Sequence, residues 1–143
     1  MKTSPAGLAL IAEFEGCKLK AYQDGGGVWT IGIGHTGPEV KEGLEWTEQQ
    51  ADAMLERDVL IAERCVNDCV TTPLVQGEYD ALVSFVFNLG CGALRRSTLL
   101  RKLLDHDYDG ASEEFLKWDH DNGVKVAGLT RRRKAEQALF ESV

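Results

Sequence analysis

The spacing of apolar residues along the chain predicts a mostly helical protein with one small β-rich segment near its N-terminus. The first helix is expected to begin after Ser4, which suits an N-cap, and to end at Gly16, which suits a helix stop. Residues 17–37 change to a pattern of short strands, and the stretch 28–35 alternates in β-forming residues. A β-rich segment therefore follows directly on the first helix.

The rest of the chain shows helical spacing interrupted by turn residues. The stretch Thr47 to Gln50 forms a capping box, which predicts a long helix with apolar positions as far as Cys69. A second helix ends at Gly90, and its nearly continuous apolar character is typical of a central core helix. The remaining expected elements are a short helix capped by Ser97, a helix carrying Ala111, Phe115 and Trp118, a turn at Asn122-Gly123, and a last helix from about Thr130 to Ser142.

Length and composition fit one soluble globular domain. The chain has 143 residues, of which 43% are hydrophobic and 27% charged. We expect a single domain over residues 1–143, with an N-terminal β-lobe at about 17–46 and a larger helical lobe. No apolar run approaches the length of a membrane span, and the first residues do not resemble a signal peptide, so we expect a protein made and held in the cytosol.

The charge balance bears on possible partners. The formal net charge is −7, which argues against a nucleic-acid binder and against attraction to an anionic membrane. The basic run Arg131 to Lys134 lies at the start of the last predicted helix. We interpret it as a solvated helix face rather than an anion-binding patch.

The chain has four cysteines, Cys17, Cys65, Cys69 and Cys91, and no pair with the C-x-x-C spacing. Cys65 and Cys69 stand four residues apart on a predicted helix, so a zinc site would need ligands from elsewhere. For a cytosolic chain we expect free, mostly buried thiols. A disulfide formed later in an oxidising compartment stays possible, and the sequence does not pair the cysteines.

Three motif matches are better explained as turns. The stretch Gly32 to Gly37 matches G-x-G-x-x-G, but no helix opens there and no parallel sheet is expected, so we reject a phosphate site. The stretch from Asp105 resembles the start of a calcium loop but has Leu116 where a glutamate is needed. Asp119 to Asp121 is interpreted as a polar turn. We therefore expect no metal and no cofactor.

Two carboxyl groups stand in contrasting surroundings. Glu15 continues the apolar stripe of the first helix, and burial there favours the protonated carboxyl that a general acid needs. Asp24 begins a glycine turn, where it can stay solvated and ionised. Two carboxyls with different environments are the arrangement used in glycoside hydrolysis.

Thr30 is the third candidate. On an alternating strand it shares a face with Gly32 and Gly34, which would leave an open floor for a sugar chain or a water molecule. Taken singly, each candidate has an ordinary explanation: Glu15 as a surface acid, Asp24 as a turn former and Thr30 as a β-former. Taken together, the spacing Glu-x8-Asp-x5-Thr is specific.

These residues belong to a longer series of motifs that covers nearly the whole chain. The stretches are Glu15-Gly16, Lys20 to Tyr22, Asp24, Trp29 to His35, Pro73-Leu74, Tyr79 to Leu82, Phe85 to Gly90, Ser97 to Leu100, Gly128-Leu129, and Arg131 to Arg133 with Glu136, Leu139 and Phe140. Together they resemble the bacteriophage endolysins of the T4-lysozyme type, glycoside hydrolase family 24. The resemblance implies an α+β, mainly α fold with a cleft between a small N-terminal β-lobe and a larger helical lobe.

The resemblance also implies an activity, which is hydrolysis of the β-1,4 bond between N-acetylmuramic acid and N-acetylglucosamine in peptidoglycan. Glu15 then corresponds to the general acid. Asp24 corresponds to the carboxylate that positions or activates water, or that stabilises the cationic transition state, and Thr30 to a residue that helps place that water. His35 corresponds to a structural support. The substrate-binding residues expected from the match are Gly32, Phe87 and Asn88.

The same resemblance implies an inverting mechanism and a monomer that binds glycan strands, with no nucleic-acid partner and no stable membrane association. The enzyme would wait in the host cytoplasm until a holin opens the membrane, and would then act on the cell wall in the periplasm. Two alternatives stay open. One is a lytic transglycosylase that uses Glu15 alone, and the other is a wall-binding module that has kept the fold without catalysis.

Overall fold

Helices dominate residues 1–142, the part of the chain that the computed structural model describes. The helices are α1 (Pro5–Glu15), α2 (Glu48–Cys69), α3 (Gln76–Leu89), α4 (Cys91–Arg95), α5 (Thr98–Leu104), α6 (Tyr108–Glu114), a 3-10 turn (Phe115–Lys117) and α7 (Ala127–Glu141). The strands are β1 (Lys18–Gln23), β2 (Trp29–Gly32), β3 (His35–Thr36), β4 (His120–Asp121) and β5 (Val124–Lys125). The predicted fold class, mainly helical with a small N-terminal β-lobe, is confirmed.

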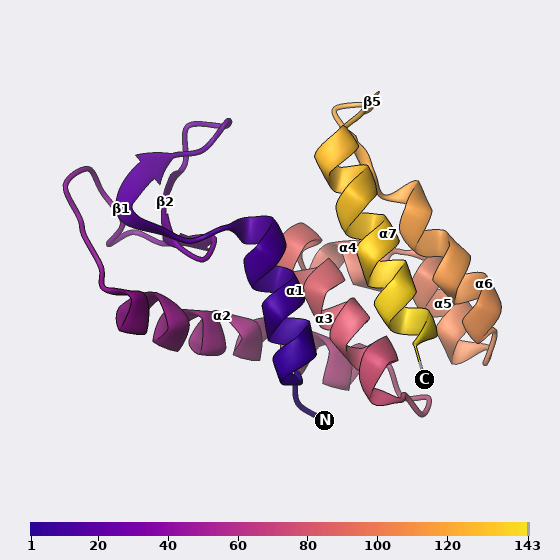
Figure 1. The fold of residues 1–143 in the computed structure, drawn as a ribbon. Coiled ribbons are helices and arrows are strands. Elements are labelled where there is room, and N and C mark those ends of the chain that lie inside the picture. The colour runs from indigo at the N-terminus through magenta and orange to yellow at the C-terminus, as the bar shows by residue number, and fades with distance from the viewer. Residues whose placement is uncertain (143) are drawn as a thin grey trace.

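The two lobes are joined by the long helix α2. Figure 1 shows the sheet of β1, β2 and β3 on one side and helices α5, α6 and α7 on the other, with α1 and α3 between them. Helix α2 contacts both β2 and α3. Helix α2 thus runs from beneath the sheet into the helical lobe.

Helix α3 is the centre of the helical lobe, as its apolar sequence predicted. Every residue from Tyr79 to Val86 is buried, and α3 contacts α1, α2, α4 and α7. Phe85 meets Phe115 and Trp118 edge-on at ring-centroid distances of 5.7 and 5.5 Å. None of the helices described has the length together with the apolar character needed to cross a bilayer.

Helix α1 is fixed to α3 at its N-terminal end by a buried carboxylate. Ser4 is the N-cap, as predicted, and its backbone N–H and hydroxyl both donate to Asp80, which also accepts a hydrogen bond from Gln76. A Cβ added at Gly7 would lie 2.8 Å from Cγ of Asp80, so only glycine allows this approach. The position of α1 fixes where its last residue, Glu15, lies.

The small sheet is antiparallel in the order β1-β2-β3. Tyr22 pairs with Thr30 across the first two strands, and Thr30 pairs with Thr36 across the next two. The sheet packs on α2, where a Cβ added at Gly32 would come within 3.4 Å of Cβ of Ala51. The sheet is therefore seated on the same helix that enters the core.

Several elements differ from the sequence predictions. Helix α4 and the β4–β5 hairpin were not expected, although the turn at Asn122-Gly123 lies at the tip of that hairpin. Helix α7 begins at Ala127, before the predicted start at about Thr130, because its N-cap position, Val126, makes no side-chain capping bond that a sequence could signal. The capped helices begin where the sequence placed them, after Thr47 and after Ser97.

The expectation of free thiols is confirmed for Cys17 and Cys69 and wrong for Cys65 and Cys91. Cys65 and Cys91 form a disulfide, and Cys17 is exposed. Cys69 is free and half-buried. The disulfide joins α2 to the unpredicted helix α4, so the sequence pattern held no signal for the pairing.

The acidic stretches of the C-terminal half serve as turns and caps, as interpreted from the sequence. Asp107 is the N-cap of α6 and accepts a hydrogen bond from the N–H of Gly110. Asp119 accepts a hydrogen bond from Thr130 and pairs with His120 at the start of the β4–β5 hairpin. The carboxylates thus have structural partners within the chain.

Candidate active site

Glu15 stands at the point where α1 ends. Gly16 stops the helix with a φ of 71°, and its N–H donates to the carbonyl of Ala12. The carboxylate of Glu15 lies against Nη1 of Arg132, 2.5 Å from Oε2, and about one-fifth of its side chain is exposed to solvent. Two residues 117 positions apart are therefore joined at the site.

The surroundings of Glu15 differ from those predicted. The sequence indicated an acid buried at the end of an apolar stripe, whereas the carboxylate is partly exposed and faces a guanidinium. The basic run was interpreted as a solvated face, which holds for Arg131 and Lys134 but is wrong for Arg132 and Arg133. Those two side chains are buried because an acidic partner, found only in the folded structure, compensates their charge.

That partner is Glu136, which is completely buried between the two arginines. Its carboxylate lies 3.4 Å from Nε of Arg132 and 2.9 Å from Nε of Arg133, and it accepts a hydrogen bond of 2.6 Å from the hydroxyl of Ser84. Arg133 also donates to the side-chain oxygen of Asn88. Burial raises the pKa of Glu136, and the positive charges of Arg133 and Arg132 oppose that rise. The cluster binds α7 to α3 directly behind Glu15.

Gly34 leaves the space that the Glu15 carboxyl occupies. A Cβ added at Gly34 would lie 2.5 Å from Oε1 of Glu15, and Gly34 has a φ of 68°. The other glycine on this face behaves differently. A Cβ added at Gly32 would meet the ring of Trp46 at 2.9 Å, so the predicted open floor at Gly32 is wrong because that face is covered by the indole ring.

Asp24 is exposed and held by the turn that the glycines form. Its Oδ1 accepts hydrogen bonds from the N–H groups of Gly26 and Val28, at 2.8 and 2.9 Å. The backbone closes the same turn, because the N–H of Gly27 donates to the carbonyl of Asp24. One carboxylate oxygen therefore fixes the orientation of the group, while Oδ2 has no hydrogen-bond partner among residues 1–142.

Tyr22 links the two carboxyl groups and was missed by the sequence analysis. Partial burial raises the pKa of Tyr22, and the negative charges of Glu15 and then Asp24 raise it further. The charges of both carboxylates thus reach the same phenol. The register of the sheet sets Tyr22 opposite Thr30. The sequence predicts that both residues lie on strands, but only the register between β1 and β2 shows that Tyr22 lies opposite Thr30.

Thr30, which pairs with Tyr22, is buried. Its hydroxyl donates to the backbone carbonyl of Val28 at 3.0 Å, which orients the oxygen and leaves its lone pairs able to accept. Thr30 belongs to the strand that follows the turn of Asp24. The structure therefore brings the third predicted residue to the same part of the β-lobe.

His35 connects the β-lobe to its support. Its Nδ1 lies 2.7 Å from Oδ2 of Asp58, and its Nε2 lies 2.6 Å from Oε1 of Glu39. Burial lowers the pKa of His35, but the hydrogen bonds to Glu39 and Asp58 outweigh it and the net pKa is raised. The ring also lies against Trp46. These contacts join β3 to α2 and to the loop between them, and the supporting role of His35 stays a prediction.

A groove adjoins the site between the lobes. It has a volume of about 300 Å³, and its lining includes Gly34 and Thr36 from the β-lobe, Ile61 from α2 and Phe87 from α3. Phe87 therefore stands where a bound chain can reach it. The side-chain oxygen of Asn88 instead accepts a hydrogen bond from Arg133.

Potential metal ligands do not gather around these carboxyl groups. Within residues 1–142, one group of cysteine, histidine or acidic side chains is close enough to hold an ion, and it consists of Cys65, Cys69 and Cys91. The chemistry available at Glu15 and Asp24 is thus that of two carboxyls, one fixed by a guanidinium and the other by backbone N–H groups.

The chain is similar to known proteins over nearly its whole length. The sequence model of the family described as "Phage lysozyme" matches residues 12–136. The chain is 47% identical to an endolysin of Acyrthosiphon pisum secondary endosymbiont phage 1, over 99% of both chains. It is 42% identical to an endolysin of Bacillus phage PZA, and it spans 56% of that longer protein.

Solved structures share the whole fold. The muramidase domain of SpmX from Asticaccaulis excentricus superposes with a TM-score of 0.92 at 40% identity, over 99% of both chains. A mutant of P22 lysozyme superposes with a TM-score of 0.89 at 37% identity, again over 99% of both chains. The lysozyme-like architecture expected from the motifs is therefore confirmed.

Replacing Gly34 with alanine should displace Glu15 and reduce catalysis. We expect Gly34→Ala to slow the clearing of a cell-wall suspension by about a hundredfold, because a shift of about 1 Å in a reacting group has that effect. Gly43→Ala is the matched control, since Gly43 also has a positive φ but an added Cβ there meets nothing within 4 Å. Both variants should lose about 1 kcal/mol of stability, and equal activity in the two would contradict this role of Gly34.

The stability of the protein should decrease as the pH rises through the folded-state pKa of His35. Because this pKa lies above its unfolded value of 6.5, protonated His35 contributes its full stabilisation below pH 6.5 and loses it at higher pH. We expect Asp58→Asn to destabilise the protein more at low pH than at high pH in urea unfolding. Asp52→Asn, an exposed change on the same helix, should show no such trend. A pH-independent effect of Asp58→Asn would refute the linkage.

Proposed function

Because the chain belongs to the phage lysozyme family, we propose that Glu15 and Asp24 are the pair of carboxyl groups that cleaves its substrate. The protein is an endolysin-type lysozyme, a glycosidase that lyses peptidoglycan. What supports the residue assignment is that Glu15 lies against Gly34, a residue lining the inter-lobe groove, and that the charges of Glu15 and Asp24 both raise the pKa of Tyr22.

Glu15 acts as the general acid. Its proton passes to the glycosidic oxygen as the bond between that oxygen and the anomeric carbon of N-acetylmuramic acid breaks. Proton donation leaves a carboxylate, and the guanidinium of Arg132 stabilises that charge where it forms. Arg132 is itself held by Ser84 and Glu136, so the acid has a fixed position before the substrate binds.

Asp24 acts on the other reacting group, a water molecule. Its Oδ1 is held by two backbone N–H groups, so Oδ2 has a fixed direction in which to accept a proton from water. The hydroxyl oxygen of Thr30 supplies a second acceptor for the same water. In an inverting reaction this water attacks the anomeric carbon from the face opposite the leaving group, and the two carboxyls stand roughly 6.5–9.5 Å apart.

The groove supplies the binding surface. Phe87 offers an apolar wall on the helical side, and Gly34 and Thr36 form the opposite side. Asn88 contributes indirectly, through its hydrogen bond to Arg133. The enzyme binds glycan strands as a monomer and needs no metal or organic cofactor for this reaction.

The cellular setting follows that of phage endolysins, which act on the cell wall. In our proposal the enzyme accumulates in the host cytoplasm, and a holin opens the membrane so that it reaches the peptidoglycan in the periplasm. The holin does not bind the enzyme directly. The observation that supports a peptidoglycan substrate here is the family membership of the whole chain.

Replacing Glu15 with glutamine should abolish lysis. We expect Glu15→Gln to reduce the rate at which the protein clears permeabilised Gram-negative cells by about 10²- to 10⁴-fold, because the amide cannot donate the required proton. Glu13→Gln is the matched control, since Glu13 is an exposed acid on the same helix. Equal lysis by wild type and Glu15→Gln would refute the assignment. A wild type that binds cell walls without lysing them would favour a binding module.

The products should identify the mechanism. An inverting hydrolase releases a reducing end with α configuration at the anomeric carbon, because water attacks a β bond from the opposite face. Proton NMR spectra recorded during the first minutes of digestion measure this configuration. A β product would establish retention. Mass spectra with 1,6-anhydro-muramoyl ends would show a lytic transglycosylase, which uses Glu15 without water.

A further inference from the structure

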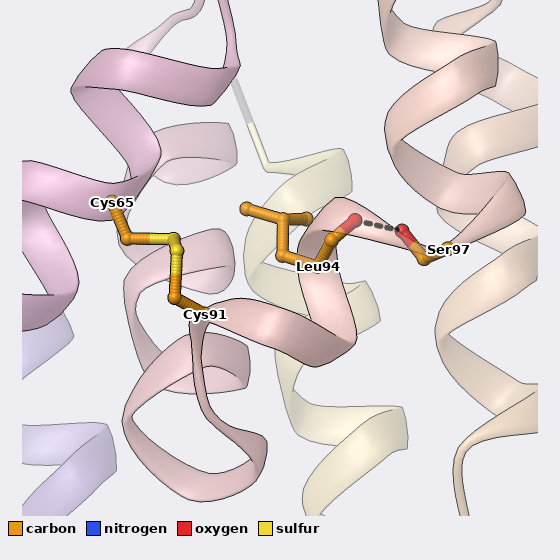
Figure 2. Close-up of a disulfide and its surroundings, with 4 residues drawn as sticks. All are labelled: Cys65, Cys91, Leu94 and Ser97. Carbon is orange, nitrogen blue, oxygen red and sulfur yellow. Dashed lines mark hydrogen bonds between the residues drawn. A yellow bond between two sulfur atoms is a disulfide. The ribbon is translucent and has the colours of Figure 1, made fainter.

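Three sulfur atoms meet at one place between α2 and α4. The Sγ atoms of Cys65, Cys69 and Cys91 all lie within 4.8 Å of one another. Figure 2 shows Cys65 on α2 reaching Cys91 at the start of α4 through the disulfide. Cys69 stands one helical turn beyond Cys65, so it lies on the same face of α2. Cys65 and Cys69 alone are too few ligands for a zinc site, and Cys91 on α4 adds a third.

The scaffold around Cys91 does not depend on the disulfide alone. Helix α4 is buried through Ala93 and Leu94. Its far end is fixed by Ser97, whose hydroxyl donates to the carbonyl of Leu94 at 2.7 Å (Figure 2). The same hydroxyl accepts a hydrogen bond from the N–H of Leu100. Reduction of the disulfide therefore leaves Cys91 facing α2, with three thiols in one cluster.

The geometry points to a binding site for a thiophilic metal ion, Zn²⁺ in particular, formed by Cys65, Cys69 and Cys91 when the disulfide is reduced. Zinc–sulfur bonds of about 2.3 Å place the sulfur atoms of a tetrahedral site about 3.8 Å apart. In the reduced chain, rotation of the three side chains would have to bring their sulfur atoms, which lie within 4.8 Å of one another, to this spacing. Soft thiolates select such ions over Mg²⁺ or Ca²⁺.

The burial of the cluster fits a three-ligand site with an accessible fourth position. Cys65 is buried, whereas Cys69 and Cys91 are half-buried. Cys91 also lines the groove between the lobes, together with Gly34, Thr36 and Phe87. An ion can reach the cluster from that groove, and a water molecule can complete its coordination.

The redox state of the chain decides whether the site exists. A dithiol reductant transfers two electrons and two protons to the Cys65–Cys91 disulfide and leaves as its own disulfide. Zinc then replaces the protons of the three thiols. In the reverse direction a small-molecule disulfide accepts two electrons and is cleaved to two thiols, Cys65 and Cys91 are joined again, and the ion loses two ligands and dissociates. Either the ion or the disulfide therefore ties α2 to α4.

The test is zinc binding by the reduced protein under anaerobic conditions. The chain is reduced with a phosphine, stripped of metal and titrated with Zn²⁺ against a chromophoric chelator. We expect one ion per chain in the reduced protein and none in the oxidised protein. Zinc should also raise the unfolding midpoint of the reduced protein and leave that of the oxidised protein unchanged.

The variants separate this site from adventitious binding. Cys69→Ser keeps the disulfide, so its fold can be verified in the oxidised state, and it should weaken zinc binding after reduction by more than about tenfold, since even outer partners of a metal are worth that much. Cys17→Ser removes an exposed cysteine outside the cluster and should leave binding unchanged.

Two results would overturn the site. One is zinc affinity that Cys69→Ser does not alter. The other is a reduced wild type that binds no zinc, whether it stays folded or unfolds without recovering its helical circular dichroism when zinc is added. A reduced chain that unfolds and then refolds on addition of one equivalent of zinc would support the proposal, because binding and folding are then coupled.

Discussion

The ion pair between Glu15 and Arg132 is the contact on which the rest of the site depends. It joins the last residue of α1 to the first part of α7, and both helices reach it by packing on α3. Glu136 makes the pair possible, because a buried guanidinium without compensating charge is very unfavourable. A buried ion cluster is weak evidence for high stability. Its value here is positional, since the cluster holds Glu15, the side chain that we propose as the proton donor.

Helix α1 is fixed at both of its ends. Asp80 holds its N-terminal turn through Ser4, and Arg132 holds the carboxyl at its C-terminal residue. Two glycines allow the close approaches: Gly7 beside Asp80, and Gly34 beside Glu15. Small residues at these points do not give flexibility. They bring two charged groups within reach of partners that a methyl group would exclude.

Local rules predicted the parts of the molecule that local interactions determine. The caps at Ser4, Thr47 and Ser97 need only a few neighbouring residues, and each begins a helix as expected. The turn at Asp24 follows from its glycines and its own carboxylate in the same way. The burial of Arg132 and the disulfide of Cys65 depend instead on elements far away in the chain, and hydrophobic spacing carries no information about such partners.

The β-lobe illustrates how one pattern can have two physical meanings. Gly32 and Gly34 fall on the same face in an alternating strand, and the sequence gives no reason to separate them. The strand ends at Gly32, which is covered by Trp46, and the chain then turns so that Gly34 faces Glu15. His35 follows at once and is tied to Asp58 on α2, the helix that enters the core. The β-lobe is therefore aligned with the helical lobe at the residues that adjoin Glu15, and the glycine turn then fixes the orientation of Asp24 on that lobe.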